Sequence, residues 1–190
     1  NVGSYLAGGT LRQYAKGMDM GKASADEMDT MRRVMAEAME DGAFGVTYAL
    51  IYPPDNFVDT DEIVEVCKIV AQYNGTYITH MRSESDNILD GLAEALEIGE
   101  RSGAAVEIYH LKASGKSSWH LMPEVIQRIT DARARGQDVT SDMYPYIASG
   151  TGFSSILPTW VAEGGKFYDN LVDPHIRQRT HRELTDPHRD

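Results

Sequence analysis

The chain has 190 residues, the usual size of one domain. Its 18 Lys and Arg residues against 29 Asp and Glu residues give a formal net charge of −11, which argues against nucleic acid and against an anionic membrane surface as partners. With 42% hydrophobic and 25% charged residues, the composition is that of a globular domain that buries a core.

Cellular location is indicated by three features. No apolar run approaches the roughly 18 residues of a membrane-spanning helix, and the first residues lack the basic and then apolar pattern of a signal peptide. The single cysteine, Cys67, excludes an internal disulfide and is typical of a reducing compartment. We therefore predict a cytoplasmic protein.

Short apolar runs alternate with stretches of helical period, which predicts βα units and a parallel sheet. The predicted strands are residues 2–7, 43–50, 76–80, 105–110 and 138–143. The predicted helices begin at residues 24, 59, 88 and 123, and a polar helical tail covers about 173–184.

Two of these helices carry clear local signals. Ser24 and Glu27 form a capping box, and the methionines that follow recur at helical spacing, which is typical of core packing. Cys67 lies mid-helix among aliphatic residues, so we expect a small buried hydrophobe rather than a ligand or nucleophile.

Five strands are too few for a closed barrel, which typically needs eight strands and about 250 residues. The chain is therefore either a small open α/β sheet or about five eighths of a barrel. In both cases ligands bind at the carboxyl ends of the strands.

Two histidines end neighbouring predicted strands, His80 and His110. Adjacent parallel strands lie about 4.8 Å apart, so both imidazoles can reach one metal ion, and imidazole is a favoured zinc ligand. The alternative is two isolated histidines held by hydrogen bonds. We expect the remaining histidines to be solvated; these are His120, His175, His181 and His188.

Further polar side chains follow the same strand ends. Arg82 and Lys112 each lie two residues beyond one of the histidines and are placed to hold an anionic group, although each could instead form a surface ion pair. Hydroxyl donors on the neighbouring loops are Tyr52, Tyr144, Tyr146, Ser149 and Thr151.

Four sequence blocks resemble the N-acyl-D-amino-acid deacylases (D-aminoacylases) of the amidohydrolase superfamily. The blocks are residues 42–54 (GAFGVTYALIYPP), 79–84 (THMRSE), 109–115 (YHLKASG) and 142–146 (DMYPY). They occur in the family's order and with similar gaps, over most of residues 1 to about 165. Together they favour the metal-binding interpretation of the two histidines.

The resemblance implies a (β/α)₈ barrel and a zinc-dependent hydrolase. It implies that His80 and His110 bind the metal, that Lys112 and Tyr144 hold the substrate's α-carboxylate, and that Tyr52 lines the pocket. The family's Gly-Ser order after the Tyr-Pro-Tyr segment is reversed here, so the serine contact to the carboxylate shifts to Ser149 or Thr151.

Several family features have no match in the chain: the His-x-His of the first strand, the metal-bridging cysteine and the catalytic aspartate of the eighth strand. Neither Cys67 nor Asp142 stands in for the missing groups, because of their positions. We therefore expect barrel strands three to seven, with residues 1–165 as an incomplete barrel and 166–190 as a tail that continues into the remainder. We expect such a piece alone to be inactive and to associate through its open sheet edges.

Two other functions remain open. A cyclic amidohydrolase of the dihydroorotase or hydantoinase type would centre its metals on a carboxylated lysine, and residues 43–50 contain no lysine. A non-catalytic acidic α/β module could bind an anionic metabolite through Arg82 and Lys112 without a metal.

Overall fold

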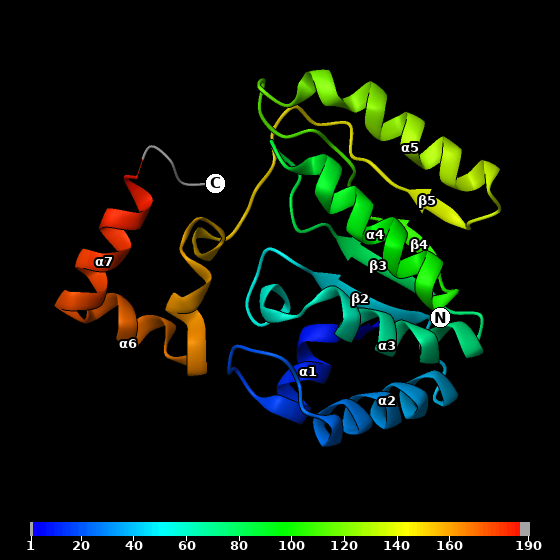
Figure 1. Ribbon diagram of the computed structural model, residues 1–190, viewed down its shortest axis with the longest axis horizontal. Coiled ribbons are helices and arrows are strands. Elements are labelled where there is room, and N and C mark those ends of the chain that lie inside the picture. The colour runs from blue at the N-terminus through cyan, green and yellow to red at the C-terminus, as the bar shows by residue number, and fades with distance from the viewer. Residues whose placement is uncertain (1, 187–190) are drawn as a thin grey trace.

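The computed structural model describes residues 2–186 and contains one parallel sheet whose five strands follow chain order (Figure 1). The strands are β1 Leu6–Ala7, β2 Gly45–Ala49, β3 Thr76–His80, β4 Ala105–Ile108 and β5 Val139–Ser141. Each strand pairs in parallel with the next one along the chain. Right-handed crossovers that always advance in one direction place the connecting helices on one side of a sheet. This winding is that of a barrel wall.

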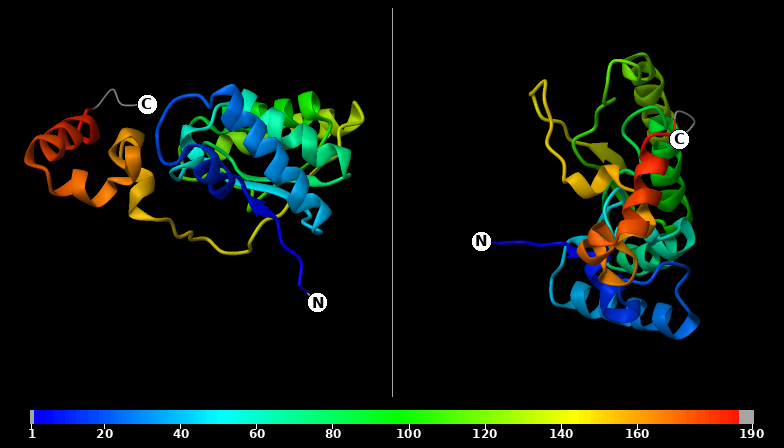
Figure 2. Two further views of the ribbon diagram at one scale, coloured as in Figure 1. Left: turned by 90° about the horizontal axis from the view of Figure 1, so that it is seen from below. Right: turned by 90° about the vertical axis from the view of Figure 1, so that its left-hand side faces the viewer.

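Seven α-helices accompany the sheet within residues 2–186. They are α1 Gly8–Lys16, α2 Ala25–Glu40, α3 Thr60–Gln72, α4 Ile88–Ser102, α5 Met122–Ala134, α6 Phe167–Val172 and α7 Pro174–Leu184. Helices α2 to α5 contact one another in turn and form a layer over the sheet, as Figure 2 shows. The core lies between this layer and the strands.

The predicted local signals are confirmed. The Ser24 hydroxyl accepts the amide of Glu27 at 3.3 Å, and the Glu27 carboxylate accepts the amide of Ser24 at 2.7 Å. Methionines Met28, Met31, Met35 and Met39 are buried. Cys67 is buried on α3, and burial raises the pKa of its thiol. The thiol therefore stays protonated and packs as a small apolar group.

Four predicted strands are too long, and two helices, α1 and α6, are missing from the prediction. The first strand ends at Ala7 as predicted but begins only at Leu6, because Leu6 pairs with Val46 and residues 2–4 lie beyond the start of β2 at Gly45. Helix α1 begins directly at Gly8; a Cβ atom there would lie 2.1 Å from the Tyr48 ring, so glycine permits close packing. The strands predicted at residues 43–50, 105–110 and 138–143 are also shorter than expected. β4 ends at Ile108 because His110 adopts a left-handed conformation and its amide donates to the Asp142 side chain.

The end of the described chain is helical. An extended segment, residues 142–152, leads from β5 to short 3₁₀ segments and then to α6 and α7, which lie beside the strand-and-helix layers in Figure 1. The Gly164 amide donates to the Met18 carbonyl at 2.9 Å and so connects this region to the α1–α2 loop. Within residues 2–186 no helix is both long enough and apolar enough to cross a bilayer.

Asp55 makes the stability of the fold depend on pH. It lies in the 3₁₀ turn after β2, where its carboxylate accepts the Ala49 amide at 2.6 Å, and burial raises its pKa to about 6. The folded chain therefore holds this proton more tightly than the unfolded chain, and the resulting stability is lost as the pH rises from about 4 through 6.

We expect Asp55→Asn to remove this dependence. Between pH 4 and 7 the unfolding free energy of the wild type should fall relative to the variant by about 2 to 3 kcal/mol, measured by urea denaturation. Asp90→Asn, at an exposed site on α4, is the control and should follow the wild type. Parallel pH curves for the wild type and Asp55→Asn would show that Asp55 titrates normally.

Candidate metal centre

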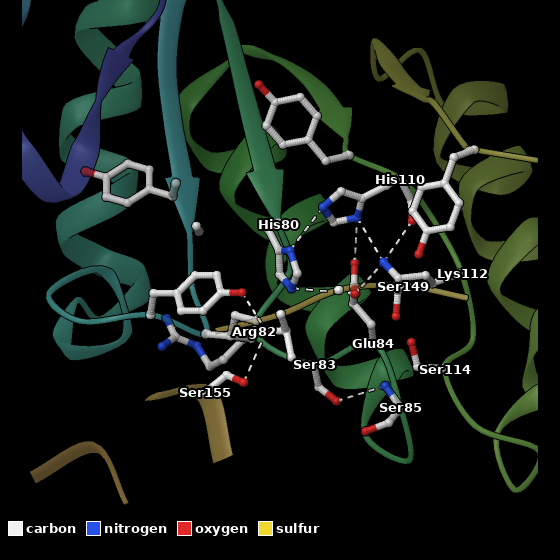
Figure 3. A pocket seen from close by; sticks show the side chains of 18 of the residues that line it. His80, Arg82, Ser83, Glu84, Ser85, His110, Lys112, Ser114, Ser149 and Ser155 are labelled. Carbon is white, nitrogen blue, oxygen red and sulfur yellow. Dashed lines mark hydrogen bonds and ion pairs between the residues drawn. The ribbon is translucent and has the colours of Figure 1, made fainter. Parts of the chain in front are cut away.

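A cleft of about 1110 Å³ opens at the carboxyl edge of β2, β3 and β4. Its wall is rich in hydroxyl groups and contains most of the predicted site residues, among them Tyr52, His80, Arg82, His110, Lys112, Tyr144, Tyr146, Ser149 and Thr151. Figure 3 shows His80, Glu84, His110 and Lys112 converging from segments that are far apart in sequence. The other described histidines, His120, His175 and His181, are exposed outside the cleft, as predicted, and His188 lies outside the described residues.

His80 and His110 meet in this cleft. His80 is the last residue of β3, while His110 lies two residues beyond β4 in a left-handed conformation with φ of 37°. Their ring centroids are 4.6 Å apart, and His80 Nδ1 lies 3.1 Å from His110 Nε2. Burial lowers the pKa of His80, which favours the neutral imidazole that a metal requires.

Glu84 lies at the centre of the cluster, and sequence reasoning did not assign it a role. Its side chain is only 8% exposed, with Oε1 2.9 Å from His110 Nδ1 and Oε2 3.5 Å from His80 Nε2. Within residues 2–186 it is the only carboxylate that lines the cleft. Its position four residues after His80, in a block already singled out, was the one available signal.

The donor chemistry of this cluster fits a divalent metal. One ligand atom each from His80, Glu84 and His110 lie within 4.8 Å of one another. Two imidazole nitrogens and a carboxylate oxygen are a typical donor set for zinc. The buried Glu84 Oε1 has no hydrogen-bond partner within the described residues. A buried oxygen of this kind needs a partner, and a bound cation would provide one.

Lys112 reaches into the same cluster. Its Nζ lies 2.5 Å from Glu84 Oε2, 2.9 Å from His110 Nδ1 and 5.5 Å from the centroid of the Tyr144 ring. The Tyr144 hydroxyl is buried and has no hydrogen-bond partner within the described residues. The lysine and the tyrosine that the family resemblance assigns to a carboxylate are thus neighbours.

Arg82 does not offer a free cation to the cleft. Its guanidinium pairs with both oxygens of Glu94, at 2.9 Å each, and donates to the carbonyl of Val58 at 2.9 Å. This geometry disfavours the anion-binding role predicted for Arg82, because its charge is neutralised by a residue of α4. Arg82 instead ties the β2–α3 loop to α4.

Tyr52 spans the cleft to the segment that follows β5. Its hydroxyl lies 2.5 Å from Thr151 Oγ1 and accepts the Gly152 amide at 3.3 Å. Tyr52 and Thr151 thus bind each other across the mouth of the cleft, while the exposed Ser149 lines the wall between them and Tyr144.

Comparisons with known proteins identify the region. No protein-family model matches the chain. It is 39% identical over 134 residues to the D-aminoacylase of Alcaligenes xylosoxydans xylosoxydans, which covers 70% of this chain and 28% of that protein. It is 37% identical over 148 residues to the N-acyl-D-aspartate deacylase of the same organism, over 77% of this chain and 30% of the relative.

Solved structures agree with the sequence comparison. A D-aminoacylase crystal structure, described as defining a subset of amidohydrolases, matches with a TM-score of 0.70 and 36% identity, over 74% of this chain and 30% of the other. The chain is a D-aminoacylase homologue. An N-acyl-D-glutamate deacylase from Bordetella bronchiseptica, solved with zinc and a phosphonate inhibitor, matches with a TM-score of 0.75 and 27% identity, over 77% and 31% of the two chains.

These matches confirm the resemblance and the predicted partial barrel. The D-aminoacylase homologue spans about 30% of the length of the relatives it matches, and its five-stranded sheet superimposes on part of their barrels.

Proposed function

We propose that the intact protein hydrolyses the amide bond of N-acyl-D-amino acids with the help of zinc. The observation that carries the proposal is the cluster of His80, Glu84, His110 and Lys112 in one cleft of a D-aminoacylase homologue. The related glutamate deacylase solved with zinc and a mimic of the tetrahedral intermediate supports this chemistry.

In this proposal some side chains bind the metal and others bind the substrate. His80 and His110 would hold zinc through neutral imidazole nitrogens. When bound, zinc supplies polarisation of the amide carbonyl and activation of water. Lys112 and the unpartnered Tyr144 hydroxyl would donate to the substrate carboxylate and so orient the scissile bond. Tyr52 and Ser149 would line the remaining wall.

The described residues contribute only part of such a site. The family's proton-transferring aspartate and bridging cysteine have no counterpart among residues 1–190, so we expect these residues alone to show negligible turnover. Three further expectations also stay predictions. They are the end of the incomplete barrel at residue 165, the association of chains through the open sheet edges, and a cytoplasmic location.

The test uses the intact enzyme and the 190-residue chain in parallel. We expect the intact enzyme to release amino acid from N-acetyl-D-amino acids and not from the L-enantiomers, to lose activity on chelation and to regain it with zinc. The 190-residue chain should be inactive under the same conditions. Enzyme that stays active after complete metal removal, or that prefers the L-enantiomers, would contradict the proposal.

Two alternatives are weaker on the geometry. A cyclic amidohydrolase would need a metal-bridging lysine, and β2 of this chain contains no lysine. The metal-free binding module needs two free cations, and the Arg82 cation is neutralised by Glu94. Assays with a hydantoin and a dihydropyrimidine, together with the metal content of the purified enzyme, would distinguish these functions.

A further inference from the structure

The Lys112 ammonium occupies the donors that a metal needs. Nζ lies 2.5 Å from Glu84 Oε2 and 2.9 Å from His110 Nδ1, and both residues belong to the candidate donor set. It also donates to the His110 carbonyl at 3.0 Å. In this arrangement Lys112 is directed into the histidine cluster and is not free to hold a substrate.

The short contacts of the cluster gather three basic side chains around one carboxylate. His110 Nδ1 lies 2.9 Å from Glu84 Oε1, and His80 Nε2 lies 3.5 Å from Glu84 Oε2. His110 Nε2 lies 3.1 Å from His80 Nδ1. The Lys112 ammonium therefore lies among the same three side chains that form the candidate metal site.

Glu84 links the lysine to the two histidines. Its side chain is only 8% exposed, and its Oε2 pairs with the Lys112 ammonium. A buried carboxylate needs a positive charge beside it, and either the ammonium or a metal ion can supply that charge.

We propose that Lys112 and a divalent metal compete for Glu84 and His110, so that metal binding releases the Lys112 ammonium to hold the substrate carboxylate. Glu84 is then the third donor for the metal and the counter-ion of Lys112 in the metal-free chain. Metal loading and carboxylate binding become coupled through this exchange. The inference rests on the metal role proposed above for His80 and His110.

The first test is a zinc titration of the 190-residue chain by calorimetry, after chelation and dialysis. We expect Lys112→Met, which keeps the apolar stem and removes the competing charge, to bind zinc about tenfold more tightly than the wild type. Lys116→Met is the matched control, because Lys116 is exposed and outside the cleft, and its zinc affinity should equal that of the wild type. Glu84→Gln should bind about tenfold more weakly.

The outcomes separate this inference from the proposed function. Zinc binding that His80→Ala abolishes but Lys112→Met leaves unchanged or weakens would overturn the competition and keep the metal site. Zinc binding insensitive to His80→Ala, or none in any variant at millimolar zinc, would overturn both the competition and a zinc site in this chain, whereas hydrolysis by the intact enzyme stands or falls with its own chelation assay. Circular dichroism melts of each variant identify any that do not fold.

A second measurement follows the lysine itself. The acetylation rate of Lys112 by a water-soluble acylating reagent, read by mass spectrometry with Lys116 as the internal standard, should rise when zinc is added to the wild type. It should not rise in His80→Ala. An unchanged rate in zinc-saturated wild type would show that the metal does not release Lys112.

Discussion

Replacement of Lys112 by alanine in the intact enzyme should raise KM and lower kcat/KM by about 100-fold. Two cations, Arg82 and Lys112, line the described cleft. Arg82 is neutralised by Glu94 on α4, whereas Lys112 pairs with Glu84 inside the cluster and remains next to the candidate substrate site. Loss of the ammonium removes the charge that would hold the substrate carboxylate, and with it the orientation of the scissile bond. Steady-state kinetics on an N-acetyl-D-amino acid measure the change.

Lys116→Ala is the control for this prediction. Lys116 lies four residues further along the same loop, is exposed and does not line the cleft, so its removal should leave KM and kcat unchanged. A kcat/KM for Lys112→Ala equal to that of the wild type would exclude Lys112 from carboxylate binding.

Replacement of Arg12 by leucine should destabilise the fold by about 3 to 5 kcal/mol, because it leaves a buried carboxylate without its counter-charge. Arg12 is fully buried on α1, where its guanidinium donates to the carbonyls of Asp19 at 3.0 Å and Gly21 at 2.8 Å. Its Nε lies 3.9 Å from Glu62 Oε2, and Glu62 in turn accepts the Ala23 amide. The pair joins the α1–α2 loop to the first turn of α3.

Urea denaturation of the 190-residue chain measures this loss. Arg101→Leu is the matched control, because Arg101 forms its two ion pairs, with Asp61 and Glu97, on the surface of α4. Exposed pairs contribute little, so the control should unfold near the wild-type midpoint. If Arg12→Leu unfolds together with the control, the buried pair does not stabilise the fold.

Local sequence patterns predicted the helices α2 to α5 and α7 and the strand β3 well. The capping box at Ser24, the methionine face of α2 and the burial of Cys67 follow from spacing along one element, and the structure confirms each. The strand ends were less predictable. His110 leaves β4 through a left-handed turn whose amide donates to Asp142, and a partner 32 residues away is not visible in the spacing.

Helix α1 shows how close packing escapes prediction. The first predicted strand ends at the Gly8-Gly9 pair, as observed, but the pair gave no sign of the helix that begins there; a Cβ atom at Gly9 would lie 1.8 Å from Asp55 Oδ1, so the glycines permit contacts made only after folding. The burial of Arg12 could not be predicted from composition or hydrophobic period. An arginine is buried only where carbonyls and a carboxylate surround it, and these partners come together only in the folded chain.

The alternation of strands and helices, the two histidines at neighbouring strand ends and the D-aminoacylase resemblance could all be predicted before folding. They follow from the period of each element and from blocks of adjacent residues, which the chain carries whatever its tertiary contacts. The pairing of charges could not: in the folded chain Glu84 pairs with His110 and Lys112, and Glu94 neutralises Arg82. A charged side chain is neutralised by whichever opposite charge folding brings within a few ångströms, and that neighbour lies on another element of the sheet.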